Sequence, residues 1–390
     1  MIVRQFISWV RTAPAGERAE ATRSLARALL FSDMSAADRA AAEGALLMLL
    51  DDASPLVRQA MAEVFSRSAE APAAIVQALS LDQASVALSV LEHSPLLIDA
   101  DLVDIIATGD GEMQCAIARR INLPAAVCAA IAEVGTPAAA LELIENPYAE
   151  LAPFSWDRIV ERHGHLAAIR ESMLVLEDLP AATRLALVGK LSDTLAQFVV
   201  ARNWLSADRA ARIVSEARDR CAVNIAARSR GDDMRSLVQH LRLTGQLTAG
   251  LILRALLSGN LELFDQALVE LSGLPPARVA ALIYDRGGAS LTALLTRAGL
   301  PQSIFPAFQA ALEANDEFGF LGNDAEAARL RRRMVERVLT RCETDAETAE
   351  PLLILLRRFA TESAREEARL FCDEMIADEA AAMQHDLIAA

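Results

Sequence analysis

The chain of 390 residues is long enough for several domains or for one elongated array of repeats. Hydrophobic residues make up 53% of it and aromatic residues only 4%, which excludes disorder of the bulk of the chain and disfavours a strand-rich fold. The formal net charge of −15 opposes general binding to nucleic acid, because a negative surface repels phosphate backbones.

The N-terminal segment and the cysteines bear on cellular location. The first ten residues, Met1-Ile-Val-Arg-Gln-Phe-Ile-Ser-Trp-Val10, are apolar, but no small-residue cleavage site follows, so we expect a helix that docks on the array. No segment approaches the roughly 20 uninterrupted apolar residues that span a bilayer, so we expect a soluble protein. Five cysteines lie in apolar helical stretches without a CxxC pair, which predicts reduced, buried thiols in the cytoplasm: Cys115, Cys128, Cys221, Cys342 and Cys372.

Residues 49–65 carry the clearest helix signal. Ser54 precedes Pro55, and we expect the serine hydroxyl to cap the free N–H groups of a helix that begins at the proline. The apolar residues that follow share one helical face: Leu56, Val57, Ala60, Met61, Val64 and Phe65. An acidic turn at Asp51 and Asp52 followed by a Val-Arg helix resembles the second helix of a HEAT-type repeat.

Similar helical units recur along the first half of the chain. The predicted helices lie within residues 73–91, 101–107, 112–120, 123–132, 138–144, 155–162 and 166–176. Thr136-Pro137 repeats the cap-and-proline arrangement of Ser54-Pro55. The spacing of roughly 25 to 30 residues is typical of stacked helix pairs, because one pair alone cannot bury both of its apolar faces.

The second half shows another repetition and longer helices. Gly273-Leu-Pro275 and Gly299-Leu-Pro301 each close a pattern of helix, glycine turn and helix. Four longer amphipathic helices are expected at residues 185–204, 206–228, 325–342 and 347–382. The last two carry Arg/Glu faces, so we expect a terminal cap or a dimerisation element there.

These patterns together predict an all-α protein. We expect a HEAT-like helical-repeat solenoid, an α-α superhelix, with a C-terminal helical cap. The predicted segments are an N-terminal helical-repeat array at residues 1–190, a second helical-repeat block at residues 191–322, and a C-terminal cap or dimerisation element at residues 323–390.

Several short motifs follow one another in a distinctive order. They are Asp51-Asp-Ala-Ser-Pro-Leu-Val-Arg58, His93-Ser-Pro-Leu-Leu97, Asp101-Leu-Val103, Ala116-Ile-Ala-Arg-Arg120 before Leu123-Pro124, Leu253-Arg-Ala-Leu-Leu-Ser-Gly-Asn-Leu-Glu-Leu-Phe264 and Gly299-Leu-Pro-Gln-Ser-Ile-Phe-Pro306. In this order they resemble an uncharacterised alphaproteobacterial domain-of-unknown-function family with HEAT-like helical repeats. The resemblance covers most of the chain. It implies a helical-repeat fold and brings no catalytic residue or ligand.

Candidates for catalysis or metal binding are few. We interpret His163-Gly-His165 as two solvated turn residues, because a metal site needs three or four converging ligands. The glycine turns lack the lysine of a P-loop and a preceding strand. Asp51, Asp101 and Asp285 fit turn and capping roles. The sequence therefore predicts no catalytic, cofactor-binding or metal-binding residue, no cofactor, and no enzymatic activity.

The basic clusters are candidates for partner binding. Near Arg331-Arg-Arg333, the residues Glu326, Glu336 and Glu343 favour a solvated, salt-bridged helix face, and we interpret Arg357-Arg358 in the same way. Second helices of HEAT-like repeats line the concave side, so the better candidates there are Arg58, Arg119 and Arg120. A flexible glycine turn beside Phe318 and Phe320 makes these aromatic residues candidates for a partner-docking loop.

The preferred functional hypothesis is a non-enzymatic cytoplasmic protein–protein interaction scaffold or adaptor in bacterial signalling or regulation. The negative overall charge favours a protein partner with a basic or amphipathic segment and makes nucleic acid an unexpected partner. The alternative is a HEAT-like nucleic-acid-binding or DNA-repair-type enzyme, which would need a continuous basic groove with aromatic residues. A homodimer assembled through the C-terminal helices is a third hypothesis.

Overall fold

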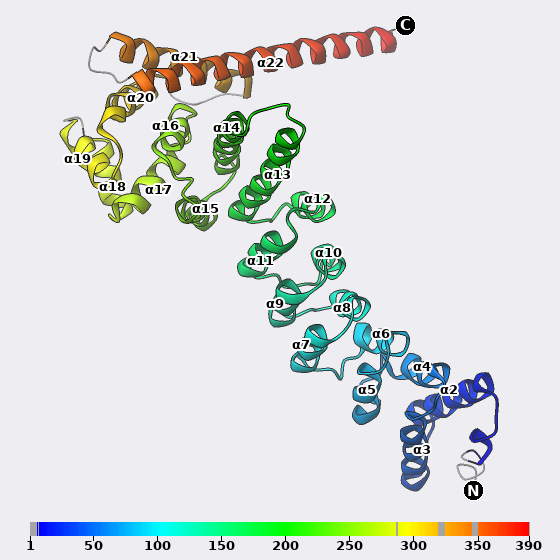
Figure 1. Cartoon of the computed structure of the whole chain (residues 1–390). Coiled ribbons are helices and arrows are strands. Elements are labelled where there is room, and N and C mark those ends of the chain that lie inside the picture. Colours follow the sequence, from blue (N-terminus) through cyan, green and yellow to red (C-terminus); the bar gives the residue numbers. More distant parts are fainter. Residues whose placement is uncertain (1–5, 7, 286–287, 319–323, 345–349, 390) are drawn as a thin grey trace. The chain divides into compact units, whose positions relative to one another are not determined.

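The structure of the chain is a computed structural model that describes residues 6, 8–285, 288–318, 324–344 and 350–389 (Figure 1). Across these residues the secondary structure is helical, with one isolated bridge between Leu123 and Ala149 and no strand. The predicted all-α class is confirmed. The chain divides into two compact units, unit 1 (Met1–Leu179) and unit 2 (Pro180–Ala390). No helix within the described part of the chain has the length and apolar character needed to cross a bilayer.

Unit 1 consists of short helices that pack in two rows. They are α2 (Ala15–Phe31), α3 (Ala36–Leu49), α4 (Pro55–Phe65), α5 (Ala73–Ser80), α6 (Ala84–His93), α7 (Asp99–Thr108), α8 (Gly111–Ala118), α9 (Ala125–Val134), α10 (Pro137–Glu145), α11 (Pro153–His163) and α12 (Ala167–Val175). In one row α4 packs on α6, α6 on α8, α8 on α10 and α10 on α12; in the other, α7 packs on α9 and α9 on α11. Most of these helices thereby bury an apolar face against the helix two places along the chain, whereas α3 packs on α2 and α4, and α5 packs on α4 and α6.

Helix starts in unit 1 agree in part with the sequence. Proline begins both α4 and α10, as predicted. At α10 the side chain of Thr136 accepts a hydrogen bond from the backbone N–H of Ala139, at 3.3 Å. The predicted hydroxyl cap at Ser54 is wrong: its side chain makes no capping bond, and its own backbone N–H donates to Asp52 Oδ1 at 2.8 Å. The acidic turn, and not the serine hydroxyl, orders this entry into α4.

Arginine side chains connect successive helix pairs of unit 1. Arg120 donates to the carbonyl oxygens of Leu91, at 2.5 Å, and Ser94, at 2.7 Å. Arg162 likewise donates to the carbonyls of Ala132 and Gly135, at 2.8 and 2.9 Å. Each arginine thus satisfies carbonyls at the carboxyl end of an earlier helix, which have no partner within that helix. The bonded residues are 26 to 30 positions apart, which matches the spacing of the predicted units.

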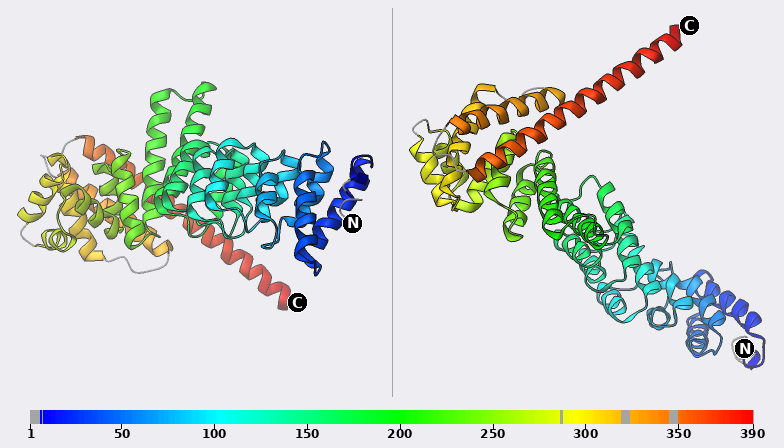
Figure 2. Two further views of the ribbon diagram at one scale, coloured as in Figure 1. Left: turned by 90° about the horizontal axis from the view of Figure 1, so that it is seen from below. Right: turned by 45° about the horizontal axis from the view of Figure 1, so that its top comes forward.

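Unit 2 begins with a long helical hairpin and continues with shorter helices. Its elements are α13 (Ala181–Ala201), α14 (Ala207–Ala226), α15 (Gly231–Leu243), α16 (Ala249–Leu257), α17 (Leu261–Ser272), α18 (Pro276–Ile283), α19 (Ala289–Arg297), η1 (Gln302–Ile304), α20 (Phe305–Phe318), α21 (Asp324–Thr344) and α22 (Glu350–Ala389). α13 packs on α14, and residue 190, a predicted segment boundary, lies within α13 (Figure 2). Gly273 and Gly299 adopt left-handed φ values of 67° and 75° after α17 and α19, so the repeated Gly-Leu-Pro motif does end helices.

The core of unit 2 joins the middle helices to the last two. Phe264 on α17 and Phe308 on α20 pack with ring centroids 5.9 Å apart. The same buried cluster includes Met334 of α21 and Leu356 of α22. α21 packs along α22, and Figure 2 shows α22 as one continuous helix. This packing places the first turns of α22 beside α16, where the candidate site lies.

Candidate functional site

The arginines singled out in the sequence are engaged within unit 1. Arg58 on α4 forms an ion pair with Asp82 and donates to the backbone carbonyl of Asp52 at 2.5 Å. Arg119, at the end of α8, pairs with Glu142 of α10 and keeps about half of its side chain exposed, 48%. Arg120 is bonded to carbonyl groups, and burial lowers the pKa of its guanidinium. Their partner-binding role stays a prediction.

The two aromatic candidates cannot be placed in a site. Phe318 is the last residue of α20, but its side chain lies outside the described part of the chain, as does the whole of Phe320.

The interpretation of His163 as a solvated turn residue is wrong. It is the last residue of α11, is buried, and has Nε2 3.3 Å from the carbonyl oxygen of Gly135. Asp101 has the predicted capping role, since its Oδ2 accepts from the N–H of Ile98 at 3.2 Å.

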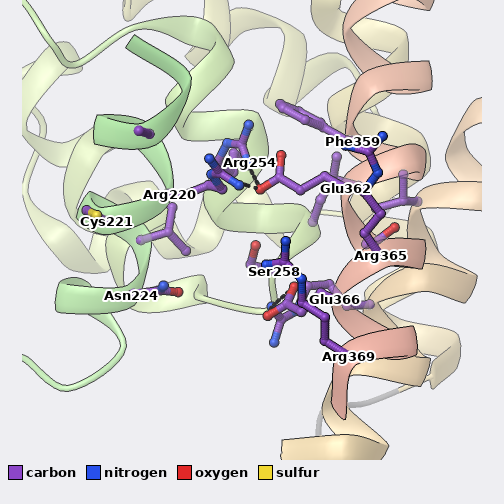
Figure 3. Close-up of a pocket in the computed structure, with 16 residues that line it drawn as sticks. Arg220, Cys221, Asn224, Arg254, Ser258, Phe359, Glu362, Arg365, Glu366 and Arg369 are labelled. Carbon is purple, nitrogen blue, oxygen red and sulfur yellow. Dashed lines mark hydrogen bonds and ion pairs between the residues drawn. The ribbon is translucent and has the colours of Figure 1, made fainter. Parts of the chain in front are cut away.

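Two adjoining cavities of unit 2 form the candidate site, which we call the arginine cleft. The inner cavity, about 420 Å³, lies between α14, α16, α21 and α22 (Figure 3). The outer cavity, about 750 Å³, lies between α14, α16 and the first turns of α22. The two cavities adjoin, because both are lined by Arg254, Phe359, Glu362 and Arg365.

Arg254 is the central side chain of the cleft. It stands in the apolar stretch of α16 and is only 8% exposed. Its Nη1 donates to Oε1 of Glu362 at 2.7 Å, and its guanidinium lies 4.4 Å from the ring centroid of Phe359. Arg220 of α14 approaches the same carboxylate oxygen at 3.5 Å (Figure 3). Glu362 therefore forms ion pairs with two guanidinium groups, those of Arg220 and Arg254.

The far side of the inner cavity contains three more arginines. Nη1 of Arg331, on α21, lies 2.9 Å from each carboxylate oxygen of Glu366. Arg365 and Arg369, on α22, are exposed and make no hydrogen bond or ion pair with another described residue. The inner cavity thus has five arginines and two glutamates in its lining, which is a surplus of positive charge.

The outer cavity has six arginines and three carboxylates in its lining, the same surplus of three positive charges as the inner cavity. Arg358 pairs with Glu216 at 2.9 Å, and Arg357 pairs with Glu343 at 3.0 Å. Arg209 and Arg212 also line it, without a partner among the described residues. Burial raises the pKa of Asp219 in its wall to about 6, and the nearby carboxylates of Glu216 and Glu362 add to this rise while Arg254 opposes it.

The chemistry of the cleft follows from its guanidinium groups. They remain protonated at physiological pH and offer planar pairs of N–H donors that match carboxylate and phosphate oxygens. Nine arginines and four carboxylates line the two cavities together. Because the whole chain carries a net charge of −15, this local excess of positive charge is opposite to the overall field. The arrangement is suited to holding an anion.

Sequence reasoning missed most of this site. The charged residue inside the apolar stretch Leu251-Ile-Leu-Arg-Ala-Leu-Leu257 is the one local signal that Arg254 has an unusual position. Arg365 and Arg369 were not singled out. Arg331, Arg357 and Arg358 were interpreted as solvated salt-bridged faces, and they do form ion pairs while also lining the cleft. No group of three metal-ligating side chains occurs among the residues that the structure describes.

Comparison with known proteins identifies the family. Residues 86–348 match the bacterial family described as "Uncharacterised protein conserved in bacteria (DUF2336)". The chain belongs to this family. No curated protein and no solved structure matches the chain. The matched range includes the α14, α16 and α21 walls of the arginine cleft, whereas α22 lies beyond it.

Proposed function

We propose that the protein is a non-enzymatic cytoplasmic interaction scaffold or adaptor that holds an acidic segment of a partner protein in the arginine cleft. In this proposal the helix pairs of unit 1 form a HEAT-like solenoid, as supported by their two rows of i, i+2 packing. Unit 2 supplies the charged recognition site. Signalling or regulation is the setting in which a bacterial cell would use such an adaptor.

The observation that carries the proposal is the surplus of arginine over carboxylate around the cleft. Arg254 is buried and already bonded to Glu362, so it fixes the geometry, while Arg365 and Arg369 are exposed and free to meet a ligand. Guanidinium groups bind carboxylates in bidentate geometry, and the fixed Arg254 keeps the shape of the cleft in which Arg365 and Arg369 do so. Binding, and not proton transfer, is the chemistry that such groups supply.

The arginines of the cleft favour a different kind of partner from the one that the net charge of the whole chain favours. A net charge of −15 favours a basic segment at long range, but contacts within a cavity depend on the groups that line it. The inner cavity has five arginines against Glu362 and Glu366. An acidic segment therefore fits this cleft better than a basic one.

The proposal is tested by fluorescence anisotropy of the full chain with labelled peptides. A glutamate-rich peptide should bind, and a lysine-rich peptide of equal length should not. The double variant R365Q/R369Q should weaken binding about tenfold or more, which corresponds to about 1.4 kcal/mol. Arg333, which is exposed on α21 and lines neither cavity, provides the matched control R333Q.

Two results would overturn this function. Equal loss of binding in R333Q would show a general charge effect instead of a site. Tighter binding of a single-stranded oligonucleotide than of the acidic peptide would favour the nucleic-acid alternative, whose affinity should fall steeply with added salt.

A further inference from the structure

Two buried donor groups of the inner cavity have no hydrogen-bond acceptor among the described residues. They are Nε of Arg254, on α16, and Nε of Arg331, on α21. Both guanidinium groups are bonded elsewhere through Nη1, to Glu362 and Glu366, so they are held in place while one N–H of each remains unused. Buried N–H groups of charged side chains normally find an acceptor. The two guanidinium groups therefore place positive charge that is only partly neutralised in the wall of the inner cavity, which favours an anion there.

The mouth of the same cavity carries two further unused guanidinium groups. Arg365 and Arg369 are separated by one helical turn on α22, so they lie on the same face of that helix. Figure 3 shows both side chains on the cavity side of α22, with Glu362 and Glu366 between the helices. The guanidinium groups of Arg254 and Arg331 are fixed in the wall, and those of Arg365 and Arg369 are free at the mouth. Such an arrangement suits a compact, highly charged ligand group.

The charge of the inner cavity selects among anions. Its five arginines exceed its two glutamates by three charges, the same surplus as in the larger outer cavity, but here they surround a smaller volume. A single carboxylate has one negative charge and two oxygens, whereas a phosphomonoester has a charge near −2 at neutral pH and three terminal oxygens. Guanidinium groups bind phosphate oxygens in the same bidentate way as carboxylates. A phosphoryl group therefore uses more of the donors than a carboxylate does.

We propose that the inner cavity binds a phosphomonoester group carried by a phosphorylated side chain of the acidic partner segment. This inference rests on the function proposed above and assigns the inner cavity to the phosphoryl group and the outer cavity to flanking carboxylates. The outer cavity suits the flanking residues because Arg209 and Arg212 remain unpaired there among the described residues, while Arg357 and Arg358 are already bonded to glutamates. The volume of about 420 Å³ accommodates a phosphorylated side chain with its backbone.

The experiment compares three acidic peptides of identical sequence except at one central position, which is serine, glutamate or phosphoserine. Binding to the full chain is measured by isothermal titration calorimetry, with far-UV circular dichroism of every variant to establish that it is folded. The phosphoserine peptide should bind at least tenfold tighter than the glutamate peptide. In R369Q and R365Q this preference should fall to threefold or less, while R333Q keeps it.

The outcomes separate this inference from the proposed function. Equal affinity for the three peptides overturns the phosphoryl site and leaves the acidic-segment scaffold standing. Failure of all three to bind overturns both. Inorganic phosphate should compete only weakly; if it binds as tightly as the phosphopeptide, the ligand is free phosphate and the assignment to a partner's side chain is wrong.

Discussion

Nη1 of Arg254 donates to Oε1 of Glu362 at 2.7 Å, although 108 residues separate them in the chain. The arginine belongs to α16 and the glutamate to α22, so this bond holds the final helix against the middle of unit 2. Phe359, one turn before the glutamate, lies against the same guanidinium. The pair therefore supports both the packing of α22 and the shape of the arginine cleft.

Replacing Glu362 with glutamine should destabilise the protein and at the same time strengthen anion binding. Loss of the carboxylate partner of a buried guanidinium should cost about 1–3 kcal/mol, less than the roughly 3–5 kcal/mol of a fully buried ion pair, because Glu362 is partly exposed. Removal of one negative charge from the cleft should tighten binding of the glutamate-rich peptide. Urea denaturation and anisotropy measure the two effects. E343Q, which removes an exposed partner of Arg357, should change stability by less than about 0.5 kcal/mol.

A stability of E362Q equal to that of the unsubstituted chain would contradict the role assigned to this bond.

Arg120 should stabilise unit 1 through its bonds to two backbone carbonyls. In R120M the apolar stem is kept, but the carbonyls of Leu91 and Ser94 lose their donors, and we expect a loss of roughly 1–3 kcal/mol. Urea denaturation followed by circular dichroism measures the change. Arg27, an exposed residue of α2, is the matched control, and R27M should have little effect. Equal stability of the two variants would show that the carbonyl bonds contribute nothing measurable.

Asp265 on α17 should make stability depend on pH. Burial raises the pKa of its carboxyl to about 6, and its buried Oδ1 has no hydrogen-bond partner among the described residues. Because the folded pKa lies above the unfolded value, the folded state favours the protonated form, and stability falls as pH rises from about 4 to about 6. D265N should therefore stabilise the protein by on the order of 1–2 kcal/mol at neutral pH and by nothing near pH 4. Urea denaturation at both pH values tests this.

A stabilisation by D265N that is the same at both pH values would show that ionisation of Asp265 is not its cause.

Asp219 should make anion binding depend on pH. Its carboxyl, with a pKa raised by burial to about 6, faces Glu216 on its own helix, Arg254 on α16 and Glu362 on α22. As pH falls through 6 the cleft loses one negative charge, so the glutamate-rich peptide, whose carboxylates titrate near 4.3, should bind more tightly at about pH 5.5 than at about pH 7.5. D219N should bind tightly at both values. A pH effect that persists in D219N would assign it to another group.

The cysteines should differ in their reactivity toward iodoacetamide. Burial raises the pKa of the Cys128 thiol to about 11, so almost no thiolate is present at neutral pH, whereas Cys372 on α22 is exposed. Mass spectrometry of the native protein should find Cys372 modified first, and Cys128 modified only after unfolding in urea. Early modification of Cys128 would contradict its burial in unit 1.

The sequence was most informative where a feature depends on neighbouring residues. Pro55 and Pro137 begin helices, Thr136 caps one, and Gly273 and Gly299 end two, because each effect acts within a few residues. The predicted Ser54 hydroxyl cap is absent, and the side-chain bond in this turn is the one that Asp52 accepts from the N–H of Ser54. The burial of His163 has no local signal, because the carbonyl of Gly135 that lies beside it comes from a helix end 28 residues earlier.

The arginine cleft could not be predicted because its members are far apart in sequence. Local periodicity paired Arg331 with nearby glutamates, and it did not show that Glu366, 35 residues later, would be its partner. Nor did any local signal place Arg254 beside Glu362. Such a site exists only once α14, α16, α21 and α22 have packed together, and that packing depends on the shared apolar core of unit 2.

The arginine-to-carbonyl bonds of unit 1 determine how the number of its helices can change. Arg120 and Arg162 each bond to a helix end that lies one helix pair earlier, and each bond involves only neighbouring pairs. Insertion or deletion of one whole pair would leave every other connection intact, provided that the next arginine meets an equivalent helix end. The length of unit 1 can therefore change in steps of one helix pair, while a deletion of half a pair would separate donors from their carbonyls.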